Sequence, residues 1–136
     1  RREGPPLMIG STGPRMLRIS LPHVQIWNAW LCRGDNSAAE VPAMRELVDT
    51  ACASVGRDPA DIERSVSIIV DPSGRDDLPT SMAGDDVKPL TGSPEEIAAG
   101  LQSFADEGIG HLQFCLAPNT VGALEEFHKV LEAMGR

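Results

Sequence analysis

The residues best suited to chemistry in this sequence form a short glycine-flanked loop, Gly10-Ser11-Thr12-Gly13, directly before a helix start at Pro14. Glycines let a backbone come close to a ligand, and the two hydroxyl groups can donate hydrogen bonds. The first turn of a helix adds amide N–H groups and the positive end of a dipole. This combination predicts an anion site of the phosphate type, although the same string is also typical of a simple helix cap.

No other group of side chains has the spacing of a catalytic or metal site. Cys32, Cys52 and Cys115 lack a C-x-x-C spacing and histidine partners, so we expect neither a disulfide framework nor a zinc site. Cys52 and Cys115 fall in apolar patterns, where a thiol packs as a small hydrophobe. The three histidines fall at strand starts or on a helix surface, where a structural role is expected.

The composition excludes several classes of partner. The net charge is -8, with 12 basic residues against 20 acidic ones, which disfavours binding to nucleic acid. No apolar run approaches the roughly 20 residues of a membrane span, and the first residues lack the apolar segment of a signal peptide. We therefore expect a cytoplasmic protein with one domain over residues 1–136.

Four strand and helix pairs account for most of the chain. Short apolar runs predict strands at 6–10, 23–27, 65–70 and 111–116. Helices are expected from Pro14, after a cap at Asn36 or Ser37, at the capping box Ser93–Glu96, and after Thr120. Two helices have clear apolar stripes, which are Val41, Met44, Leu47, Val48, Ala51, Cys52 and Val55 before Gly56, and Val121, Leu124, Phe127, Val130, Leu131 and Met134 before Gly135.

Residues 71–92 are rich in Gly, Pro, Ser and Asp without periodicity, which predicts a flexible loop that acts as a lid. The order βα, repeated four times, predicts an α/β fold with parallel strands and helices outside. Both an open doubly wound sheet and an arc of a (β/α)8 barrel fit this order, and a closed barrel needs eight such units.

Three segments resemble the luciferase-like monooxygenase family, especially its deazaflavin-dependent branch. They are residues 6–18 followed by Ile26-Trp27-Asn28, residues 52–65, and residues 92–98 with 108–112. The match covers nearly the whole chain, in order, and corresponds to the second half of the family's barrel. The resemblance therefore implies the C-terminal half of a TIM (β/α)8 barrel, with about four βα units.

The resemblance also implies a function, which is that of part of a flavin- or deazaflavin-dependent oxidoreductase. In the family the first loop holds the phosphate end of the cofactor. The cofactor-binding residues implied here are Gly10, Ser11, Thr12, Gly13, Arg15, Trp27 and Asn28. Trp27 fits an anchor of the barrel wall equally well. The Gly-Pro-Arg string favours coenzyme F420, with FMN as the alternative.

Family enzymes take most ring-contacting and proton-transferring residues from the first half of the barrel, so no catalytic residue is assigned to this segment. Oxidoreductase or monooxygenase activity toward a small organic substrate is expected of a complete protein and is uncertain for this segment alone. The alternative function is a non-catalytic half-barrel that binds a phosphorylated ligand or a partner chain. Because four parallel strands leave two unpaired edges, we expect either a homodimer or a missing N-terminal half-barrel.

Overall fold

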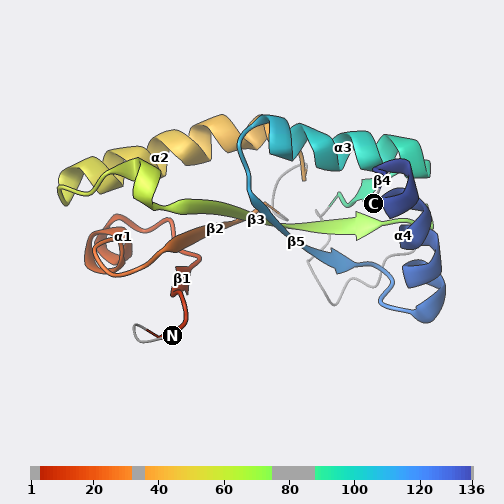
Figure 1. Cartoon of the computed structure of the whole chain (residues 1–136), viewed down its shortest axis with the longest axis horizontal. Coiled ribbons are helices and arrows are strands. Elements are labelled where there is room, and N and C mark those ends of the chain that lie inside the picture. Colours follow the sequence, from red (N-terminus) through yellow and green to blue (C-terminus); the bar gives the residue numbers. More distant parts are fainter. Residues whose placement is uncertain (1–3, 32–35, 75–87, 136) are drawn as a thin grey trace.

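The computed structural model describes residues 4–31, 36–74 and 88–135, which form alternating parallel strands and helices (Figure 1). The strands are β1 (Met8–Ile9), β2 (Ile26–Trp30), β3 (Glu63–Asp71), β4 (Leu90–Thr91) and β5 (His111–Leu116). The helices are α1 (Pro14–Ser20), α2 (Val41–Ser54), α3 (Pro94–Asp106) and α4 (Val121–Ala133), with single 3-10 turns at Ala38–Glu40 and Pro59–Asp61.

The sheet is wound in one direction. Strand β1 pairs with β2, β2 with β3, and β3 with β5, all in parallel, so each main strand lies beside its predecessor. A doubly wound sheet would instead reverse its strand order at a switch point. The chain is therefore an arc of a (β/α)8 barrel, which confirms the expected fold class and decides between the two architectures.

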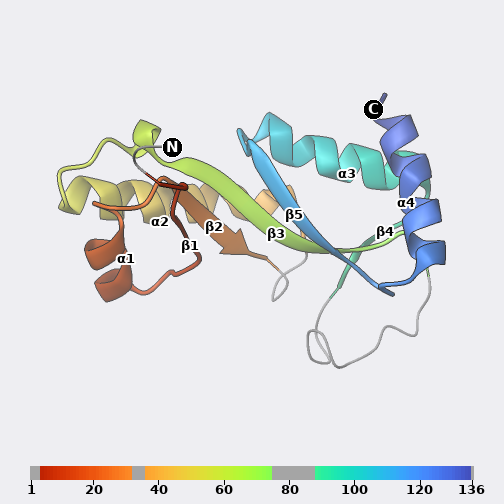
Figure 2. The same ribbon diagram turned by 60° about the horizontal axis from the view of Figure 1, so that its bottom comes forward.

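The two faces of the sheet differ sharply because side chains alternate along each strand. On β3 the residues Val66, Ile68 and Val70 join one apolar core with buried side chains from all four helices. The alternate residues of β3, with those of β2 and β5 in register, lie on the opposite face, which is the inner face of the arc. Both views place α1 and α4 at opposite ends of the molecule (Figure 2).

Most predicted helix ends are confirmed. The capping box is complete, because Glu96 N donates to Ser93 Oγ at 3.2 Å and Ser93 N donates to Glu96 Oε2 at 2.7 Å. Thr120 caps α4 by accepting from Ala123 N at 3.2 Å. Gly56 ends α2 with φ at +70°, a conformation that favours glycine.

Three expectations need correction. The second strand begins at Ile26 and ends at Trp30, three residues later than predicted, because residues 21–23 form a turn after α1. The predicted loop at 71–92 contains the short strand β4, while residues 75–87 of the predicted lid lie outside the described residues. Val121 and Leu124 belong to the predicted apolar stripe of α4 but are 73% and 54% exposed.

Asn36 completes the edge of β3 between two strands. Its Oδ1 accepts from Ile69 N at 3.0 Å, and its Nδ2 donates to Lys88 O at 2.6 Å, just before β4 begins. The side chain thus takes the place that a neighbouring strand would fill between β2 and β4. Asn36 is 1% exposed and has φ at +48°, a conformation that asparagine tolerates better than most residues. Sequence analysis offered it only as one of two possible helix caps.

We predict that Asn36→Gly lowers the free energy of unfolding by about 1–3 kcal/mol, because the buried N–H of Ile69 loses its acceptor. Asn36→Ala should cost roughly 1 kcal/mol more, since alanine also resists a positive φ. Urea unfolding of both variants checks this, with exposed Asn119→Ala as a control expected to be near neutral. Equal stability of Asn36→Gly and the unmodified chain would contradict the bridging role.

Candidate functional site

The loop after β1 is open to solvent. Gly10, Thr12 and Gly13 are exposed and Ser11 is half-buried, so the loop has not folded into the core. Gly13 is the N-cap of α1, and no side chain caps that helix. Within the loop, Gly13 N donates to Ser11 Oγ at 3.3 Å. Thr12 and the first residues of α1 are thus exposed, and no side-chain cap occupies the start of that helix.

Trp27 holds this loop from behind. Its side chain is 2% exposed and belongs to the helix-facing core, and its Nε1 donates to Ser11 O at 2.8 Å. A buried indole thus fixes the backbone of the loop without itself lying on the inner face. The geometry places Trp27 as a wall residue that positions the predicted phosphate loop.

The surroundings of the loop limit what binds there. Helix α1 has only seven residues, so its dipole is small, and Arg15 is an exposed side chain in its first turn. Beside it an open groove of about 510 Å³ runs between α1 and α2, with Thr12 at one side and the carboxylate Glu46 at the other. Because a carboxylate repels anions, an anion would be held by the loop itself and not by this groove.

A chain of hydrogen bonds crosses the inner face of the sheet. Ser65 Oγ donates to Asn28 Oδ1 at 2.9 Å, and Asn28 Nδ2 donates to Ser67 Oγ at 2.9 Å. Ser67 Oγ can then donate to Gln113 Oε1 at 3.3 Å. His111 Nδ1 lies 3.3 Å from Ser65 Oγ, and since that hydroxyl gives its proton to Asn28, this direction requires the Nδ1–H tautomer of His111.

The same face shows that the sheet is curled. Gln113 Nε2 on β5 lies 3.5 Å from Met8 Sδ on β1, although β2 and β3 separate these strands. Three strand spacings would hold them about 14 Å apart on a flat sheet. The contact is possible because the arc is concave toward this face.

Asn28 lies at the centre of this chain of hydrogen bonds, and Trp30 is a residue of the same face that the sequence analysis did not predict. Asn28 lies on the inner face in the middle of β2, not at the carboxyl end of the strand as the predicted strand 23–27 implied, and its amide is engaged with Ser65 and Ser67. Trp30 ends β2 on the same face and is 49% exposed, so its ring is the aromatic surface at this rim. The alternation of β2 would have pointed to Trp30 if its end had been predicted correctly.

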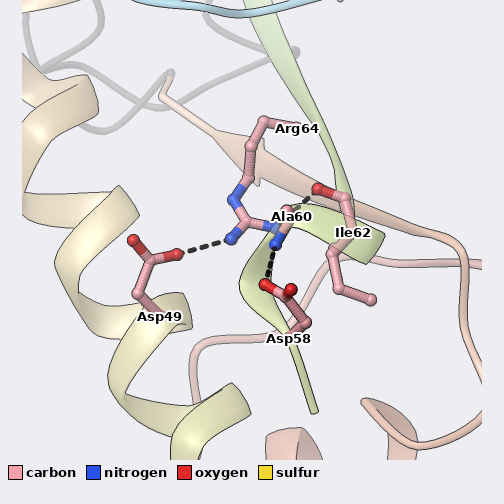
Figure 3. A network of polar contacts seen from close by, with 5 residues as sticks. All are labelled: Asp49, Asp58, Ala60, Ile62 and Arg64. Carbon is pink, nitrogen blue, oxygen red and sulfur yellow. Dashed lines mark hydrogen bonds and ion pairs between the residues drawn. The ribbon is translucent and has the colours of Figure 1, made fainter.

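Other titratable groups serve the framework. Figure 3 shows Arg64 at the start of β3, where it donates to Asp49 Oδ1 on α2 at 2.6 Å and to Ile62 O at 2.8 Å. Burial raises the pKa of the Cys52 thiol, against an opposing effect of Arg64, so this thiol stays protonated and inert. Cys52 packs in the core as predicted, whereas Cys115 is half-buried on the inner face.

Neither a metal centre nor a membrane helix is found in the described part of the chain. No group of three or more His, Cys, Asp or Glu residues within 4–31, 36–74 and 88–135 could hold a metal ion. None of the helices in these ranges is long and apolar enough to cross a membrane.

No protein-family model and no curated protein matches the sequence. Among solved structures, the chain is similar to an F420-dependent secondary alcohol dehydrogenase in complex with an F420-acetone adduct, with a TM-score of 0.64 and 15% identity over 96% of this chain and 49% of that one. It is also similar to the coenzyme F420 dependent tetrahydromethanopterin reductase from Methanopyrus kandleri, with a TM-score of 0.59 and 10% identity over 92% of this chain and 48% of that one. The chain thus has the fold of these enzymes and spans about half their length.

We predict that Asn28→Ala destabilises the chain by about 1–3 kcal/mol, because the hydroxyl of fully buried Ser65 loses its acceptor. Gln113→Ala, at the exposed end of the same hydrogen-bond chain, should cost under about 1 kcal/mol. Chemical denaturation of both variants makes the comparison. If the two costs are equal, Asn28 is not the hub of the inner face.

Proposed function

We propose that this chain is the cofactor-phosphate-binding part of an F420-dependent oxidoreductase, with the phosphate held by the loop Gly10–Gly13. The observation that carries the proposal is the loop itself. It lies at the carboxyl end of β1, stays open to solvent, and is held in place by Trp27 through Ser11 O. Active sites of (β/α)8 barrels gather at the carboxyl ends of the strands.

The residues present fit a phosphate group. Ser11 and Thr12 supply hydroxyl donors, and the start of α1 has no side-chain cap to compete with an anion for its amides. Exposed Arg15 adds a positive charge one residue beyond the helix start. Bound F420 would supply the hydride chemistry, and this chain's own residues would anchor its phosphate end.

Coenzyme F420 is preferred to FMN for two reasons. The Gly13-Pro14-Arg15 string resembles the deazaflavin-dependent branch of the family. The solved structures of similar fold are also F420-dependent by their names, which supports the same cofactor. In this proposal Trp30, on the inner face at the end of β2, offers a surface for stacking against a cofactor ring.

The reacting groups would come from elsewhere in the complete enzyme. Among the described residues, the inner-face side chains Asn28, Ser65 and Ser67 hydrogen-bond one another, which suits a filled barrel interior. We therefore propose that this segment binds and orients cofactor, and that oxidoreductase activity toward a small organic substrate belongs to the complete protein.

We predict that the chain binds F420, followed by the polarisation of the cofactor's own fluorescence, and that Thr12→Glu weakens this binding at least about tenfold. A carboxylate placed beside the phosphate repels it, and tenfold corresponds to about 1.4 kcal/mol. Ala99→Glu, which makes the same charge change at an exposed position on α3, should bind like the unmodified chain. FMN in a parallel titration tests the cofactor preference.

Equal affinity of Thr12→Glu and Ala99→Glu would show that the phosphate does not lie at this loop. Competition with inorganic phosphate separates the alternative function. A chain that binds F420 and FMN no more tightly than inorganic phosphate would be a binder of phosphorylated ligands in general.

A further inference from the structure

Exposed apolar side chains gather at the two ends of the arc. Seven of the eight exposed large hydrophobic side chains in the described chain lie there. The first group, at β1 and α1, is Leu7 just before β1 with Met8, Met16 and Ile19, and the second, on β5 and α4, is Phe114, Val121 and Leu124. Trp30 is the eighth. Apolar side chains concentrated in this way mark surfaces that another protein covers.

Each end also presents a free strand edge. Within the described ranges, β1 pairs only with β2 and β5 pairs only with β3, so both outer edges are open. Open edges of parallel strands are templates for pairing with another chain. Each end thus combines an open strand edge with a helix that has exposed apolar side chains, β1 with α1 at one end and β5 with α4 at the other.

We propose that two copies of this chain associate end to end and close one eight-stranded barrel. A two-fold axis along the barrel keeps every strand in the same direction. Strand β1 of one copy then pairs in parallel with β5 of the other at both seams, and α1 lies beside α4. The four main strands of each copy, β1, β2, β3 and β5, give eight, the number at which side chains fill the interior of such a barrel.

The two ends suit each other. Helix α1 presents Met16 and Ile19 with the basic residues Arg15 and Arg18, and has no acidic residue. Helix α4 presents Val121 and Leu124, and it carries three glutamates and one lysine. Apolar contact and opposite charge therefore coincide at each seam. Pairing of like ends would instead place α1 against α1 and bring four arginines together.

The length of the similar structures gives the size of a complete fold of this type. This chain matches 49% and 48% of those two chains, so a complete fold of this type is about twice its size. Two copies of this chain together reach that size. The inference concerns assembly and needs no cofactor, so its failure is separate from that of the proposed function.

The first test is the mass of the unmodified chain by size-exclusion chromatography with light scattering. The expected mass is twice 14.5 kDa, without larger oligomers, because two copies leave no open edge. A monomer mass of 14.5 kDa at the highest soluble concentration overturns the proposal. A different set of four βα units would then cover the two ends. A series of larger oligomers also overturns it, since the ends would then join without closing.

The second test alters one end at a time. Ile19→Asp, on α1, and Leu124→Lys, on α4, should each give a monomer, because every dimer contains two seams and each seam uses both ends. Mixing the two variants should restore the dimer, with one unaltered seam and one seam of opposite charges. Ala99→Asp, on the exposed side of α3, should stay dimeric. Circular dichroism checks that each variant remains folded.

A dimer that survives Ile19→Asp or Leu124→Lys alone would show that like ends are joined, which contradicts the proposal. Failure of the mixture to dimerise, with both variants folded, contradicts it as well.

Discussion

The pairing of β3 along both of its edges is the constraint on which the other features depend. One edge of β3 pairs with β5 from Ser65 to Val70, and the other edge pairs with β2 and then with β4. Between β2 and β4, the side chain of Asn36 hydrogen-bonds to this edge of β3 at Ile69 N. With both edges occupied, the alternate side chains of β3 are committed to opposite faces, one in the apolar core under the helices and one in the polar inner layer. The core and the inner layer are thus two consequences of one strand.

Much of this arrangement could be predicted from local patterns, and the exceptions have physical causes. The stripe of α2, the capping box of α3 and the limits of β5 depend on residues close in sequence, so periodicity and caps predict them. The end of β2 is different, because Ile26–Trp30 has no Gly or Pro to mark where it stops, and pairing with β3 decides its length. Asn36 and the hydrogen-bond chain through Asn28 depend on residues more than thirty positions away. Val121 and Leu124 follow the helical period correctly, but what would cover them is not among the described residues.

The candidate site shows how a loop is kept both open and ordered. A loop whose hydroxyls point into the core would be stable but unable to bind an anion, and an unsupported loop would lose entropy on binding. Trp27 resolves this conflict by bonding to the carbonyl of Ser11 from the buried side, which leaves the hydroxyl of Thr12 exposed. The sequence predicted Trp27 either as a cofactor-binding residue or as an anchor of the barrel wall. In the structure Trp27 is a wall residue, and its hydrogen bond to Ser11 O holds the loop in position.

The distribution of polarity over the arc also bears on how the chain functions. A protein that worked as an open half-barrel would need polar side chains at the two ends of its arc, whereas its concave face could remain apolar for a ligand. The chain has the reverse arrangement. On its inner face the amides of Asn28 and Gln113 hydrogen-bond the hydroxyls of Ser65 and Ser67, and its two ends carry Met16, Ile19, Val121 and Leu124. Covering such side chains with another surface contributes roughly 25 cal/mol per Å² of apolar area buried. This distribution supports the proposals that the inner face belongs to a closed barrel, that the two ends are its seams, and that the loop after β1 binds a small ligand.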